Sequence, residues 1–142
     1  MGSPNDASKM ASAAEMLDRF GVPHTTQVMS AHRTPDAVVA FAAGARAEGV
    51  GAVICGAGMA AHLAGAVAAQ TTLPVIGVPL SGGLADGLDA LLSTVQMPRG
   101  IPVATVAVNG AANAAVLAVE IFAVADERLG TQLAEFRAAG AR

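Results

Sequence analysis

The sequence AVICGAGMAAHL, residues 52–63, decides the fold class of this chain. Its first four residues form a continuous apolar run, which is typical of a strand covered on both faces. A glycine-rich turn follows, and a helical pattern begins at residue 59 and continues to about residue 70. A buried strand that leads directly into a helix is the unit from which parallel sheets are built, so we expect an α/β fold.

The same alternation of strand and helix continues on both sides of this stretch. The other expected strands lie at residues 25–29, 74–79 (PVIGVP) and 103–108 (VATVAV). Further helices are expected at residues 10–20, 35–48, 84–95, 112–125 and 126–137. One domain is the default at this length and no linker interrupts the chain, so residues 1–142 are expected to form one domain with a helix layer on each face of a parallel sheet.

The composition is unusually poor in charge. Charged residues make up 13% of the chain and hydrophobic residues 54%, whereas about 25% of residues are charged in typical domains. Either large subunit interfaces or an alanine-rich coding bias explains this composition, and the sequence leaves both readings open. The net charge of −3, without a basic run, argues against a nucleic-acid surface.

The sequence also contains no targeting signal that we can recognise. No apolar run reaches the roughly 20 residues of a membrane helix, and the first ten residues lack the basic start and apolar core of a signal peptide. A single cysteine rules out an internal disulfide. We therefore expect a soluble cytoplasmic protein with no membrane or nucleic-acid partner.

Polar residues gather where the expected strands end. SAHRTPD (30–36), GAGMAAH (56–62), SGG (81–83) and NGAAN (109–113) each follow one strand. Ligands of open α/β sheets bind outside the carboxyl ends of the strands, so these four loops predict one site.

Individual motifs in these loops leave alternatives open. GAGMAA fits the glycine pattern of dinucleotide sites, but no acid ends the next strand, so a tight turn without a ligand is an equal alternative. His32 has the residue type that transfers protons near neutral pH. His32 and His62 lack the further ligands of a metal set, so we expect no metal. Ser3 and Asp6 begin the first helix and are read either as its cap or as part of an anion site.

Taken together, the motifs identify a family. The segments FGVPHTTQVMSAHRTPD, ICGAGMAAHLAG and LLSTVQMPRGIPVATVAV occur in an order that closely resembles the PurE-type N5-carboxyaminoimidazole ribonucleotide mutases of purine biosynthesis. The resemblance covers nearly the whole chain. It implies a flavodoxin-like three-layer αβα fold and a homo-octamer with active sites between subunits, in which the helix at about 126–138 packs on a neighbouring subunit. It also implies an isomerase that works without a cofactor.

The resemblance assigns roles to individual residues. His32 matches the family's general acid and base. Substrate-binding positions of the family are matched by Arg33, Ser3 and Asp6. Arg33 is expected to bind a phosphate group, and Asp6 is expected to bind ribose hydroxyls. The matching pocket loops also contain Ser30, Gly58 and His62, which we expect to bind substrate. The arginine at position 33 resembles the mutases more than the related carboxylases, which tend to have lysine there.

Three departures from the family pattern lead to further expectations. The chain starts where the family's first strand ends, so we expect a sheet without that strand. We also expect Met1 to be an internal methionine of a longer reading frame. Met59 replaces a glycine and is strained if its φ is positive. Ala64 replaces a proline and is expected to loosen its loop. One alternative is a related carboxylase that uses free carbon dioxide. Another is a nucleotide-binding homologue that lost activity through Met59 or the missing strand.

Overall fold

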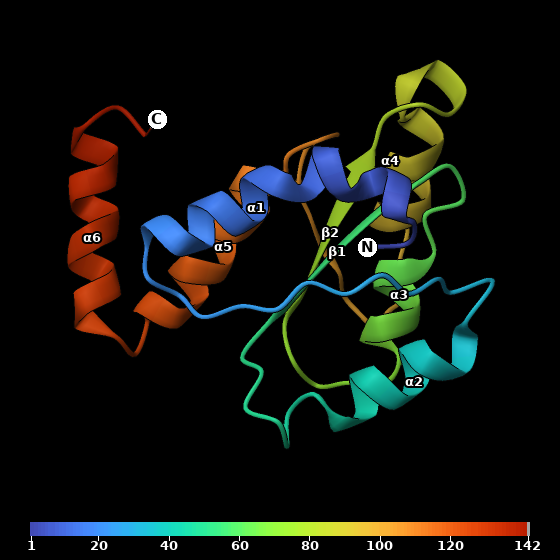
Figure 1. Ribbon diagram of the computed structural model, residues 1–142, viewed down its shortest axis with the longest axis horizontal. Helices are drawn as coiled ribbons and strands as arrows, with labels where there is room; N and C mark the ends of the chain where they lie inside the picture. The colour runs from blue at the N-terminus through green and yellow to red at the C-terminus, as the bar shows by residue number, and fades with distance from the viewer. Residues whose placement is uncertain (142) are drawn as a thin grey trace.

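The structure is a computed structural model that describes residues 1–141, and it has helices on both faces of a parallel sheet (Figure 1). The strands are β1 (Val53–Gly58), β2 (Val75–Leu80) and β3 (Ala104–Thr105), in the order β1–β2–β3. Both pairings are parallel, and every residue of β2 is buried. The expected α/β class with a parallel sheet is therefore confirmed.

The helices divide between the two faces of the sheet. They are η1 (Pro4–Asp6), α1 (Ala7–Arg19), α2 (Pro35–Gly44), α3 (Leu63–Ala68), η2 (Leu84–Asp86), α4 (Leu88–Val95), α5 (Ala111–Ala123) and α6 (Glu127–Ala138). One core joins α1, α5 and α6 to one face of β2, and a second core joins α2 and α3 to the other face of the sheet. None of these helices, within residues 1–141, is long and apolar enough to cross a membrane.

Alternation along β2 supplies both cores. Ile76, Val78 and Leu80 belong to the core with α1 and α5, whereas Val75 belongs to the core with α2 and α3. Gly77 lies against α4, where an added Cβ would be 2.3 Å from a methyl carbon of Thr94. The small residue therefore lets α4 pack closely on the central strand.

The strand expected at residues 25–29 is not formed, and that prediction is wrong. Residues 22–29 run beside α1 (Figure 1). A cavity of about 410 Å³ lies between this segment, α1 and β1. Backbone hydrogen bonds join this segment to Met1. The Met1 amine donates to the Gln27 oxygen at 2.8 Å, and the Met29 nitrogen donates to the Met1 oxygen at 3.0 Å. A strand needs a neighbouring strand to pair with, and the β-forming side chains of residues 25–29 cannot supply one.

The strand at residues 103–108 is shorter than expected. Regular pairing covers only Ala104 and Thr105. Beyond them, Val106 donates to the Gly77 oxygen and Asn109 donates to the Pro79 oxygen. The segment therefore still follows β2 up to the carboxyl end of the sheet.

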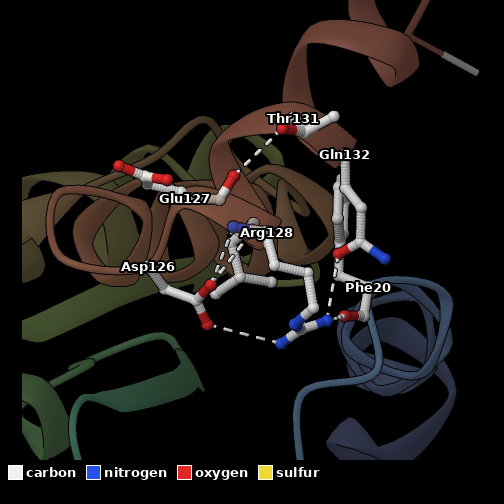
Figure 2. Close-up of polar contacts among 7 residues, drawn as sticks. Phe20, Asp126, Glu127, Arg128, Thr131 and Gln132 are labelled. Atoms are coloured by element: carbon white, nitrogen blue, oxygen red, sulfur yellow. Dashed lines mark hydrogen bonds and ion pairs between the residues drawn. The ribbon is translucent and has the colours of Figure 1, made fainter.

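The last helix, α6, is fixed to the end of α1. Asp126 caps α6 by accepting from the backbone nitrogens of Arg128 and Leu129 (Figure 2). The Arg128 guanidinium donates to the Phe20 carbonyl at 3.4 Å, and Phe136 meets Phe20 edge to face. Helix α6 thus packs on its own chain, far from α2 and α3 (Figure 1).

Candidate functional site

Residues 30–34 form a closed turn that leads into α2. The Ser30 hydroxyl oxygen accepts from the backbone nitrogens of His32 and Arg33 at 3.3 and 3.2 Å. The Thr34 hydroxyl bonds back to the backbone of Ser30 rather than capping α2. Because Ser30 accepts twice through its oxygen, its hydroxyl hydrogen is free to point at a ligand. Pro35 then begins the helix.

The turn brings His32 against the glycine loop. Nε2 of His32 lies 2.8 Å from Nδ1 of His62, 30 residues further along the chain. The two rings are 4.9 Å apart between centroids and are inclined by 83°. Both residues are exposed, so a ligand in solution can reach the pair.

The glycine loop combines a packing role with strain. An added Cβ on Gly56 would lie 2.3 Å from Sδ of Met10, so this glycine serves the close approach of α1 to β1 rather than the approach of a ligand. Gly58 ends β1 beside the Leu80 backbone. Met59 follows with φ of 54°, which confirms that this position requires the left-handed region. Ala64 is buried inside α3 rather than in a loop.

The start of the chain lies beside the same strand. The Gly2 nitrogen donates to the Gly56 oxygen at 3.0 Å, which holds Ser3 near the end of β1. The Ser3 hydroxyl caps η1 through the Asn5 nitrogen, as one reading of the sequence expected. Asp6 makes no capping bond to α1, so its half-buried carboxylate does not act as a cap.

The loops after β2 and β3 are tied to each other and to α1. Asn109 has φ of 58° and its side chain accepts from the Ser81 nitrogen at 3.0 Å. The Lys9 ammonium donates to the Ser81 carbonyl at 2.7 Å. Sequence reasoning missed Lys9. A usable signal was that the only lysine of the chain lies in the first turn of a helix, where the dipole disfavours a cation.

Several expected site residues therefore meet at the carboxyl end of β1. His32 contacts His62, Ser30 and Arg33 share one turn with His32, and Gly58 leads into the loop that carries His62. Ser3 joins the same strand through Gly2. The cavity of about 410 Å³ is lined by neither His32 nor His62, so it is separate from this cluster.

The chemistry of this cluster is that of proton transfer and anion binding. Within residues 1–141, no group of three or more histidine, cysteine, aspartate or glutamate side chains is arranged to hold a metal ion. Burial raises the pKa of the Cys55 thiol to about 12, which leaves it protonated and unreactive. The exposed imidazole pair and the neighbouring guanidinium of Arg33 are the groups that a phosphorylated ligand can use.

Comparison with known proteins gives one consistent family. The AIR carboxylase family model matches residues 1–142. A phosphoribosylaminoimidazole carboxylase of Vigna aconitifolia is 53% identical over 137 residues, which are 96% of this chain and 25% of that protein. The N5-carboxyaminoimidazole ribonucleotide mutase of Mycobacterium tuberculosis is 52% identical over 96% of this chain and 79% of its own length.

The fold comparison agrees with the sequence comparison. The crystal structure of Treponema denticola PurE matches with a TM-score of 0.87 and 28% identity, over 99% of this chain and 88% of that one. The chain spans about a quarter of the length of the Vigna protein but most of the mycobacterial and Treponema proteins.

Proposed function

The chain belongs to the AIR carboxylase family, and we propose that it is an N5-carboxyaminoimidazole ribonucleotide mutase of purine biosynthesis. The observation that carries this proposal is the 52% identity with the mycobacterial mutase over 96% of the chain. The cluster at the carboxyl end of β1 supports the proposal, because it combines a residue type that transfers protons with a cation suited to phosphate.

The proposed reaction is an isomerisation. The carboxylate leaves the exocyclic nitrogen as carbon dioxide when the carbon–nitrogen bond breaks, and the nitrogen gains a proton. Ring carbon 4 then attacks the trapped carbon dioxide and loses its own proton. One proton is given and one is taken, so the reaction needs no external acid, base or cofactor.

We assign both proton transfers to His32. Its ring stands at the tip of an exposed turn and can face the substrate. Arg33 is the proposed phosphate partner, because a guanidinium is a fixed, permanently charged donor set for phosphate. The hydroxyl hydrogen of Ser30, free as described above, is proposed to donate to the same substrate.

The remaining contacts are proposed on both sides of the end of β1. Ser3 and Asp6 bind the sugar part of the substrate, with the Asp6 carboxylate accepting from ribose hydroxyls. Gly58 lets the substrate approach the strand end. His62 completes the pocket beside His32.

We also propose that the enzyme acts as a homo-octamer with active sites between subunits. Leu88, Leu92 and Val95 lie on one face of α4 at spacings of four and three residues, and they are 45%, 49% and 46% exposed. Such an apolar row favours a contact with another copy. Val124, 89% exposed next to α6, supports the proposal that residues 126–138 also touch a neighbour. We propose a cytoplasmic location, because a phosphorylated substrate does not cross a membrane freely.

One alternative has a specific observation behind it, namely that the Vigna relative is named a carboxylase. The test supplies purified protein with the N5-carboxyamino nucleotide, or with aminoimidazole ribonucleotide and bicarbonate, and follows the 4-carboxy product. The proposal predicts efficient turnover of the first substrate alone. Preference for the second would make the protein a carboxylase, and product from neither would make it an inactive homologue.

A further inference from the structure

We propose that His62 is a positioning residue for His32, and that it sets which nitrogen of His32 exchanges protons with the substrate. This inference rests on the proposed function for the role of His32. It refines the expectation that His62 belongs to the substrate pocket.

The geometry places one hydrogen between the two rings. Nε2 of His32 and Nδ1 of His62 are 2.8 Å apart, which is a normal hydrogen-bond distance. The near-perpendicular rings, inclined by 83°, allow both nitrogens to use in-plane orbitals. Two neutral imidazoles share one hydrogen in such a contact, so one nitrogen donates and the other accepts.

The direction follows from the proton that His32 carries during the reaction. A protonated imidazole donates through both nitrogens, so Nδ1 of His62 must then be the acceptor and His62 must hold its own hydrogen on Nε2. After His32 gives its proton away, the same contact keeps a hydrogen on Nε2 of His32. The nitrogen left to exchange protons is therefore Nδ1 of His32.

Each step then balances through one atom. Nδ1–H of His32 gives its proton to the exocyclic nitrogen as the carbon–nitrogen bond breaks. When ring carbon 4 has bonded to carbon dioxide, its proton moves to Nδ1 and the electron pair returns to the ring. His62 gains and loses no proton in either step.

The contact also restricts an otherwise mobile side chain. His32 is exposed, and an exposed histidine samples several rotamers. The bond to His62 selects one of them, which is the role that a carboxylate has toward the histidine of a catalytic triad. A substitution that removes the acceptor should therefore lower kcat more than it changes KM.

The test compares His62→Asn with His62→Gln and His62→Ala. The amide oxygen of asparagine can take the place of Nδ1 of His62 and accept from His32. The glutamine amide instead reaches the position of Nε2 of His62, so it does not restore this acceptor. We expect His62→Asn to retain most of the wild-type kcat, and the other two variants to lose about 10- to 100-fold in kcat with KM unchanged. If His62 instead holds substrate through Nε2, His62→Gln will retain activity, His62→Asn will raise KM, and the inference is overturned.

A second measurement needs no substrate. Imidazole NMR of the free protein should show a hydrogen-bonded Nε2–H of His32 that persists in His62→Asn and exchanges rapidly in His62→Ala. An Nε2–H signal that is the same in wild type and His62→Ala would overturn the positioning role. Because this readout is independent of turnover, a protein without mutase activity that shows the expected signal refutes the proposed function and leaves the contact established.

Discussion

Replacing Met59 by glycine should stabilise the protein, although it removes a side chain from the loop that carries His62. Met59 has φ of 54°, and a residue with a Cβ in the left-handed region costs about 1–2 kcal/mol. Glycine removes this strain, but its greater freedom in the unfolded chain costs about 0.5–1 kcal/mol. The side chain is 65% exposed, so little burial is lost.

The net gain is on the order of 0.5–1 kcal/mol in the free energy of unfolding. For a domain of this size, that corresponds to a rise of about 2–4 °C in Tm. The measurement is thermal and urea unfolding of wild type, Met59→Gly and Met59→Ala at one protein concentration. Met59→Ala is the matched control, because it shortens the side chain and keeps the strained backbone. A Met59→Gly protein no more stable than Met59→Ala would refute the argument from backbone strain.

Three further predictions concern the site, the core and the last helix. His32→Asn should lower kcat by about 10²- to 10⁴-fold with little change in substrate affinity, measured by calorimetry, and near-normal turnover would remove His32 from the mechanism. Cys55 should resist a thiol reagent until the protein unfolds. Burial raises the pKa of its thiol from 9.0 to about 12, so its contribution to the free energy of unfolding is present below pH 9 and is lost as the pH rises toward 12. Unfolding measured between about pH 8 and 12 should show this loss in the wild type and not in Cys55→Ala. Asp126→Ala should lower the free energy of unfolding by about 0.5–2 kcal/mol, whereas Asp126→Asn keeps a capping oxygen and should lose less; equal losses would argue against the cap.

The sequence predicted the fold class well because the strongest signals were local. The apolar runs at 52–55 and 74–79 became β1 and β2, and the helical patterns after residues 35 and 111 became α2 and α5. The failure at residues 25–29 has a physical cause, since a strand exists only with a partner to pair with. That partner is a property of the assembled sheet and cannot be read from the β-forming residues themselves.

The sequence predicted the loops that form the site but not the contacts between their side chains. The sequence placed the loops of His32 and His62 at one edge of the sheet, and the two side chains do meet at the end of β1, although residues 25–29, which precede this loop, form no strand. Their direct contact depends on side-chain rotamers, and the packing role of Gly56 depends on Met10 from another helix. Spacing in the sequence encodes neither of these contacts, nor the bond from Lys9 to Ser81.

The most direct test of the proposed mutase activity follows the carboxyl carbon itself. The N5-carboxyamino nucleotide, with a heavy carbon isotope in its carboxylate, is converted by the protein in buffer containing unlabelled bicarbonate. Mass spectrometry of the 4-carboxy product then measures how much label is retained. A mutase that traps carbon dioxide in its site predicts retention of nearly all the label. Product with the isotopic composition of the dissolved bicarbonate would show that free carbon dioxide is the substrate and would contradict the proposal.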